Sequence, residues 1–265
     1  MRKLVLSAAL ALLFLTANLA TAQSVFDGTW KTDLSNEFSS NKPDVYVLQN
    51  GMYDCKTCNP PFKVKADGKD QAISGNPYID TVAIKVVSDH EILETDKKGG
   101  KVVSTSSSTV SPDGKSLSFE FNDSSNTNGG PPVTGKGQAT KVADGPAGTH
   151  PISGSWKLAK FENISDNGIV WTYKVNGNEI TMTNPTGQNY TAKLDGTEAP
   201  MKGDPGVTSV SVKMLGSDTL QETDKRDGKL IGVMTMTAAG DGKSAKIKYE
   251  DKLQDRRFEA TAVKQ

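Results

Sequence analysis

Apolar and polar residues alternate with a period of two along most of this chain. Between positions 82 and 86, for example, Val82, Ile84 and Val86 are separated by Ala83 and Lys85. The same alternation recurs around Phe119 and Phe121 and around Ile247 and Tyr249. Because successive side chains of a strand point to opposite faces, this pattern predicts strands with one buried face. No segment of useful length has the periodicity of an amphipathic helix, so the chain is predicted to be all-β.

The two halves of the chain repeat one another. Three motifs return after 128 positions: Gly-x-Pro at 75–77 and 203–205, Glu-Thr-Asp-Lys at 94–97 and 222–225, and Asp-Gly-Lys-Ser at 113–116 and 241–244. So many matches in one register indicate a tandem repeat. The Gly- and Pro-rich residues 144–151 are interpreted as a linker. We therefore expect one domain over residues 23–143 and another over 152–265.

Each half contains about eight or nine short strands, separated by dipeptides typical of tight hairpins. These dipeptides are Asn50-Gly51, Asp67-Gly68, Asp113-Gly114, Asn176-Gly177, Asp195-Gly196 and Asp241-Gly242. Strands joined in sequence predict an up-and-down antiparallel meander. A meander of this size protects its edges by closing into a barrel, whose interior holds side chains or one small ligand. The prediction is two tandem barrels, and two β-sandwiches are the alternative.

Both halves begin with a related tetrapeptide, Gly-Thr-Trp-Lys at 28–31 and Gly-Ser-Trp-Lys at 154–157. It resembles the Gly-x-Trp first strand of the calycins, which include the lipocalins and fatty-acid-binding proteins. The doubled pattern is similar to uncharacterised secreted bacterial proteins with lipocalin-like repeats. The resemblance implies that Trp30 and Trp156 close one end of each barrel, and that a barrel holds a small hydrophobic ligand. Fatty-acid-binding proteins place two helices after this strand, whereas residues 34–43 are too few for two helices.

The first 22 residues have the features of a secretory signal peptide. Arg2 and Lys3 precede an uncharged stretch from Leu4 to Leu15, and a small-x-small site ends at Ala22. The uncharged stretch is shorter than the roughly 20 residues that span a bilayer, which argues against a membrane anchor. We expect the mature chain to begin at Gln23 and to be secreted or periplasmic, with no transmembrane segment.

The charge balance argues against a nucleic-acid partner. The chain has 31 basic and 31 acidic residues, and removal of the signal peptide takes away two basic residues and no acidic ones. The mature chain is therefore close to neutral, without the clustered Lys and Arg that phosphate binding requires. The oligomeric state is not predicted.

Cys55 and Cys58 are the two cysteines of the chain and form a Cys-x-x-Cys motif. In an oxidising compartment they favour a local disulfide that tightens a hairpin. A thioredoxin-like redox pair would need a helix N-terminus, and zinc would need further ligands, of which the chain offers only two histidines. The second half has no cysteine, so the disulfide is expected to be dispensable for the fold.

Two carboxylate pairs, Glu94 with Asp96 and Glu222 with Asp224, lie at strand spacing. Residues two apart on a strand share a face, so one member of a buried pair would have a raised pKa and could act as an acid or base. The interpretation we favour is cross-strand pairing with lysines, worth only tenths of a kcal/mol. The lysines in question are Lys85, Lys97, Lys213 and Lys225.

Together these features predict an exported, non-enzymatic binding module without a cofactor. Its ligand is expected to be a small apolar molecule held inside a barrel, although no contact residue can be named. A structural or interaction protein of the cell envelope is the alternative. A thiol-redox or metal-binding protein that uses Cys55 and Cys58 is a weaker one. A cavity of about 300 Å³ or more would favour binding.

Overall fold

The computed structural model describes residues 24–35 and 39–265, so the predicted signal peptide lies outside the described residues. The described chain is all-β, apart from one short 3₁₀ helix, η1 (Asp166–Gly168). None of its helices is long and apolar enough to cross a membrane. The strands are β1 (Gly28–Thr32), β2 (Ser39–Ser40), β3 (Asp44–Gln49), β4 (Met52–Cys55), β5 (Phe62–Lys65), β6 (Gln71–Ala72), β7 (Thr81–Ser88), β8 (Glu91–Lys98), β9 (Lys101–Val110), β10 (Ser116–Asp123), β11 (Val133–Asp144), β12 (Gly154–Ile164), β13 (Val170–Asn176), β14 (Glu179–Thr183), β15 (Asn189–Lys193), β16 (Asp195–Pro200), β17 (Ser209–Met214), β18 (Thr219–Arg226), β19 (Lys229–Ala238), β20 (Ser244–Asp251) and β21 (Arg256–Lys264).

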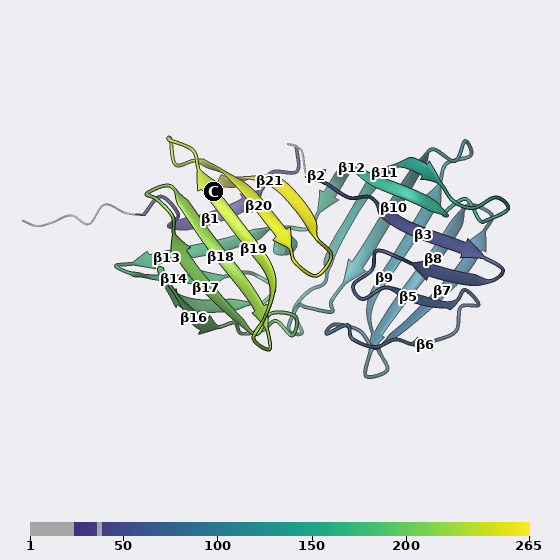
Figure 1. Ribbon diagram of the computed structural model, residues 1–265, viewed down its shortest axis with the longest axis horizontal. Coiled ribbons are helices and arrows are strands. Elements are labelled where there is room, and N and C mark those ends of the chain that lie inside the picture. Colours follow the sequence, from purple (N-terminus) through teal and green to yellow (C-terminus); the bar gives the residue numbers. More distant parts are fainter. Residues whose placement is uncertain (1–23, 36–38) are drawn as a thin grey trace, which may run out of the picture.

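The strands form two antiparallel sheets, and each sheet curls into a nearly closed barrel (Figure 1). Barrel 1 has the strand order β5-β4-β3-β12-β11-β10-β9-β8-β7-β6. Barrel 2 has the order β15-β14-β13-β1-β21-β20-β19-β18-β17-β16, and β2 is attached to β21. The prediction of two antiparallel barrels is confirmed, because tight turns join strands that alternate between apolar inward and polar outward residues.

The first strand of each repeat lies in the barrel that is built mainly from the other repeat. β1, which carries Trp30, pairs with β13 and β21 of the second repeat. β12, which carries Trp156, pairs with β3 and β11 of the first. The exchange is geometrically possible because both strands dock in the same register: Gly28 lies opposite Tyr173, and Gly154 lies opposite Tyr46.

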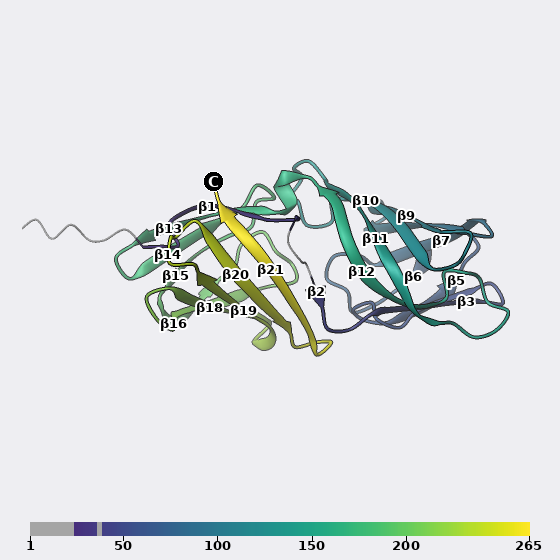
Figure 2. The ribbon, with the colours of Figure 1, turned by 90° about the horizontal axis from the view of Figure 1, so that it is seen from above.

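The barrels therefore do not coincide with the ranges 23–143 and 152–265 expected from the repeat. Barrel 1 is one continuous segment, residues 44–164, which is inserted between β1 and the rest of barrel 2. Residues 144–151 do not link the barrels either. They belong to the turn between β11 and β12, two paired strands of barrel 1. The chain crosses between the barrels elsewhere, once between β2 and β3 and once between β12 and β13 (Figure 2).

Each barrel also receives a hairpin loop from the other. The β10–β11 loop of barrel 1 reaches barrel 2, where the Asn128 side-chain amide donates to the Thr186 and Gly203 carbonyls, both at 2.9 Å. The shorter β20–β21 loop of barrel 2 reaches barrel 1, where the Gln254 amide donates to the Thr57 carbonyl at 2.6 Å. These reciprocal contacts hold the two barrels against each other.

The two tryptophans are almost fully buried and make the same contacts in each barrel. The Trp30 indole donates to the Phe26 carbonyl at 2.8 Å, and Lys264 lies 4.9 Å from its ring centre. The Trp156 indole donates to the Ile152 carbonyl at 2.8 Å in the same way. Lys141 is placed over this second ring as Lys264 is over the first, at 4.8 Å. Each tryptophan thus binds the turn before its own strand and packs against a lysine of the adjacent strand, β21 for Trp30 and β11 for Trp156.

Candidate ligand cavity in barrel 1

Barrel 1 contains a cavity of about 470 Å³. Its wall is mostly aromatic and aliphatic and includes Tyr53, Ile92, Leu117, Phe119 and Phe161. Such a volume lies within the range of small-molecule sites, which are typically concave, apolar and furnished with a few polar groups.

The cavity exists where barrel 1 has serines in place of methionines. Ser106 and Ser108 on β9 face it, and they pair with Glu94 and Ile92 of β8. In barrel 2, Met234 and Met236 on β19 occupy the corresponding positions, opposite Glu222 and Leu220. Met236 is completely buried in the core of barrel 2. The short serine side chains leave open in barrel 1 the space that thioether side chains fill in barrel 2.

Aromatic rings form one side of this cavity. Tyr46 and Tyr53 are stacked with ring centres 6.0 Å apart, and Phe119 meets Phe161 edge-on at the same separation. Burial raises the pKa of both tyrosines well above the usual value, and nearby carboxyl groups raise it further. The phenols therefore stay neutral and offer flat, rigid surfaces with a polar edge.

Two acidic side chains line the cavity, Glu94 and Asp44, and Asp44 is paired with Arg256. Burial, together with the neighbouring Asp96, raises the pKa of Glu94 to about 8. Burial also raises the pKa of Asp96, to about 6. Near neutral pH the Glu94 carboxyl is therefore largely protonated and can both donate and accept a hydrogen bond.

The expected pairing of these carboxyl groups with lysines is wrong. Lys97 binds Asp70 at 2.6 Å, and in the second repeat Lys225 binds Glu198. The reason is strand alternation: Glu94 and Asp96 share the inward face of β8 with Ile92, whereas Lys97 lies on the opposite face. In barrel 2, Glu222 and Asp224 are likewise buried.

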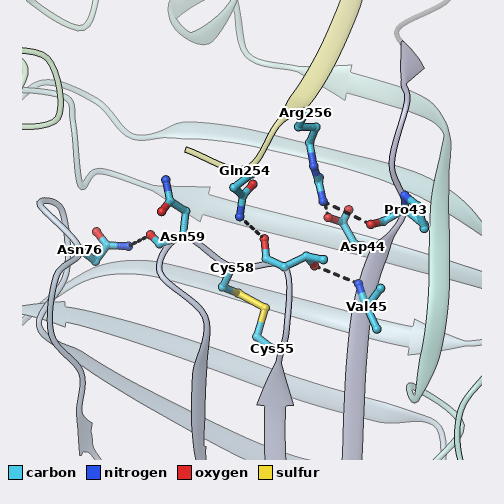
Figure 3. Close-up of a disulfide and its surroundings, with 10 residues drawn as sticks. Pro43, Asp44, Val45, Cys55, Cys58, Asn59, Asn76, Gln254 and Arg256 are labelled. Carbon is cyan, nitrogen blue, oxygen red and sulfur yellow. Dashed lines mark hydrogen bonds and ion pairs between the residues drawn. A yellow bond between two sulfur atoms is a disulfide. The ribbon is translucent and has the colours of Figure 1, made fainter. Parts of the chain in front are cut away.

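The rim of the cavity is completed by barrel 2. Arg256 reaches across to barrel 1, where its guanidinium binds the Asp44 carboxylate at 2.7 Å and the Pro43 carbonyl at 3.2 Å (Figure 3). Phe258, two residues further along β21, also lines the cavity. Side chains of the β20–β21 hairpin are thus part of the site, and the sequence repeat alone gave no sign of this.

The predicted disulfide is present. Cys55 and Cys58 are bonded, with their Cα atoms 5.5 Å apart. Cys55 is buried at the end of β4, opposite Tyr46, and Cys58 lines the cavity. In barrel 2, Met182 takes the place opposite Tyr173. No three potential ligands among His, Cys, Asp and Glu converge on a metal position within the described part of the chain.

No protein-family model matches this chain, and no curated protein matches it. The resemblance to calycins therefore stays a prediction, and the site must be interpreted from its own geometry.

Proposed function

We propose that this protein is an exported, non-enzymatic binding module that holds a small hydrophobic molecule inside barrel 1. The observation that carries the proposal is the cavity of about 470 Å³ opened by Ser106 and Ser108. Its aromatic wall would supply most of the binding free energy through apolar burial, at about 25 cal/mol per Å². Glu94 would orient a polar end of the ligand through one hydrogen bond.

Filling the cavity is the direct test of this proposal. The double variant Ser106→Met and Ser108→Met places in barrel 1 the side chains that barrel 2 carries. N-phenyl-1-naphthylamine, a neutral apolar dye, should become fluorescent with the unmodified protein and bind at least about tenfold more weakly to the double variant, a loss of about 1.4 kcal/mol. Ser107→Met is the matched control, because Ser107 lies between the two serines on the opposite face of β9.

Equal dye binding by the double variant and the Ser107→Met variant would refute the proposal. Native mass spectrometry of the protein purified from its host adds a second measurement, since a bound apolar molecule should leave when barrel 1 is filled. If the unmodified protein carries no cargo and does not bind the dye, the structural alternative is favoured.

A further inference from the structure

A second pocket, of about 480 Å³, lies between the two barrels and is called the interbarrel pocket below. Barrel 1 contributes Phe121 and Asp123 from β10, and barrel 2 contributes Trp171 from β13 and Glu222 and Asp224 from β18. It is separate from the cavity proposed above to hold an apolar molecule.

The interbarrel pocket is acidic. Four carboxyl groups line it, from Asp123, Asp204, Glu222 and Asp224, and no lysine, arginine or histidine is among its lining residues. Carboxylates without cationic partners create a negative potential that a low-dielectric wall strengthens. The pocket is therefore suited to a positively charged ligand.

Hydrogen bonds hold one of these carboxylates in place. Asp204 accepts from the Tyr78 hydroxyl at 2.8 Å, from the Asn126 amide at 3.0 Å and from the Gly206 backbone N–H at 2.7 Å. Tyr78 and Asn126 belong to the first repeat and Asp204 to the second, so these bonds join the barrels. The pocket is consequently preformed.

Among the four carboxyl groups of the pocket, Asp224 has an oxygen atom without a hydrogen-bond donor. Its side chain faces the pocket, the residue is only 7% exposed, and its Oδ1 atom has no hydrogen-bond partner within the protein. Asn126 Oδ1, another acceptor lining the pocket, is also buried without a partner. A buried acceptor left unpaired costs free energy, so a ligand that donates hydrogen bonds to both atoms would recover it.

The arrangement favours an organic cation over a metal ion. A calcium ion needs six or more oxygen ligands at one point, and no three carboxyl, thiol or imidazole groups converge in this way in the part of the chain that the structure describes. The carboxyl groups are instead spread around the pocket, between apolar side chains such as Met182 and Met201 and the rings of Phe121 and Trp171. A ligand with ammonium groups on a carbon chain fits such a lining, because its charged ends can reach the carboxyl groups and its carbon chain can contact the apolar side chains. Ammonium groups are also attracted to aromatic faces.

We propose that the interbarrel pocket binds an organic cation with one or more ammonium groups, of the class of short aliphatic diamines. Asp224 is the principal acceptor, Asp123 contributes negative charge, and Glu222 ionises when the ammonium group binds. Burial raises the pKa of Asp224 to about 6, where it faces Glu222 on the same strand, Tyr249 on β20 and the Asp204 carboxylate. Burial and Asp224 raise the pKa of Glu222 to about 8, and Tyr190 on β15 hydrogen-bonds to it. An ammonium group favours the ionised carboxylates, so binding should release protons.

The test is isothermal titration calorimetry with 1,5-diaminopentane, with 1,5-pentanediol as the uncharged analogue of equal length. The diamine should bind and the diol should not, and titrations in two buffers of different ionisation enthalpy should reveal proton release. Asp224→Asn keeps the shape and should weaken diamine binding at least about tenfold. Asp96→Asn is the matched control, because Asp96 occupies the same place in the first repeat and does not line this pocket.

Three results would overturn the proposal: no heat with millimolar diamine, equal affinity for the diol, or equal affinity in the Asp224→Asn variant. An equal loss in the Asp96→Asn variant would also overturn it, by showing that binding follows net charge and not this pocket. Filling barrel 1 with Ser106→Met and Ser108→Met should leave diamine binding unchanged. The two proposals can therefore fail separately.

Discussion

Barrel 1 and barrel 2 have the same frame and different interiors. In both, a tryptophan from the exchanged strand is buried beneath a lysine from the adjacent strand, β11 or β21. In both, a tyrosine lies opposite the glycine that begins the exchanged strand. The positions that hold the barrel together are thus the same, whereas the positions that fill it differ. When the positions that hold the barrel together are kept, the residues that fill one barrel can change to smaller ones and open a cavity there, while those of the other barrel still fill its interior.

Two pairs of positions account for much of this difference. Ser106 and Ser108 face the interior of barrel 1 where Met234 and Met236 face that of barrel 2. The second difference concerns the buried glutamate. In barrel 2 the Tyr190 hydroxyl hydrogen-bonds to the Glu222 carboxyl group. The matching residue of the first repeat is Phe62, which has no hydroxyl with which to engage Glu94. Glu94 therefore faces the cavity of barrel 1, whereas Glu222 is held by Tyr190 at the wall of the interbarrel pocket.

The strand exchange gives the largest expected effect. Trp30→Ala should destabilise barrel 2, and Trp156→Ala should destabilise barrel 1, each by about 3–5 kcal/mol, the usual cost of truncating a buried tryptophan. Hydrogen exchange should show that Trp30→Ala lowers protection in β13–β21 and spares β3–β12, although Trp30 belongs to the first repeat. Loss of protection in residues 44–143 instead would mean that the strands are not exchanged.

The same comparison predicts which fragment folds alone. Residues 44–164 contain every strand of barrel 1 and should unfold cooperatively, with the Trp156 fluorescence of a buried indole. A matched fragment, residues 44–153, lacks β12 and should lose that cooperative transition. If both fragments behave alike, β12 is not an essential strand of barrel 1.

Exchanging the interior residues should convert one barrel toward the other. Met236→Ser removes a fully buried side chain from barrel 2 and should lower the free energy of unfolding by about 2–5 kcal/mol. The reverse change in barrel 1, Ser108→Met, fills an existing cavity and should cost far less or even stabilise. Guanidinium unfolding of the two variants measures both changes. Similar losses in both would show that the two positions are packed alike.

Both barrels should become less stable as the pH rises. The buried carboxyls have raised pKa values, about 8 for Glu94 and Glu222 and about 6 for Asp96 and Asp224. Between pH 5 and 8 the folded state therefore binds more protons than the unfolded state, and stability falls as the pH rises through the folded pKa values. We expect a loss of several kcal/mol between pH 5 and 8.5, reduced by about half in the Glu222→Gln and Asp224→Asn double variant, because barrel 1 keeps its own pair. Stability that increases over this interval would contradict the burial of these groups.

The fold class was readable from the sequence because alternation and turn dipeptides are local signals. The exchange was not, because Gly28–Lys31 and Gly154–Lys157 carry nearly the same pattern and either strand could occupy either barrel. Only the tertiary course of the two connecting segments decides between the arrangements. A repeat in the sequence therefore predicted how many barrels form, but not which strands each one contains.

Part of the candidate site in barrel 1 could also be predicted from the sequence. Glu94 and Asp96 follow Ile92 at a spacing of two, so the alternation already placed them on the buried face of the strand. The interpretation as partners of lysines did not take into account that these positions share a face with Ile92. Aligning the repeats also places Ser106 and Ser108 against Met234 and Met236, a loss of volume that predicts a cavity. The contribution of Arg256 was not accessible, since a contact between barrels depends on how they are arranged in space.

The smallest expected effect concerns the disulfide, which barrel 1 has and barrel 2 lacks. Replacing Cys55 and Cys58 by Ser should cost about 2 kcal/mol or less, because the bond closes a loop of only a few residues and constrains the unfolded chain little. The loss should be confined to barrel 1, since in barrel 2 Met182 serves the same position without a covalent link. Hydrogen exchange of the double variant should show faster opening of β4 and β5 and unchanged protection in β13–β21. Because Cys58 also lines the cavity, dye binding should weaken slightly while the barrel persists. Global unfolding of the variant would instead show that the disulfide is needed to keep barrel 1 folded. Side-chain packing alone, which stabilises barrel 2, would then be too weak in barrel 1, because the cavity removes part of that packing.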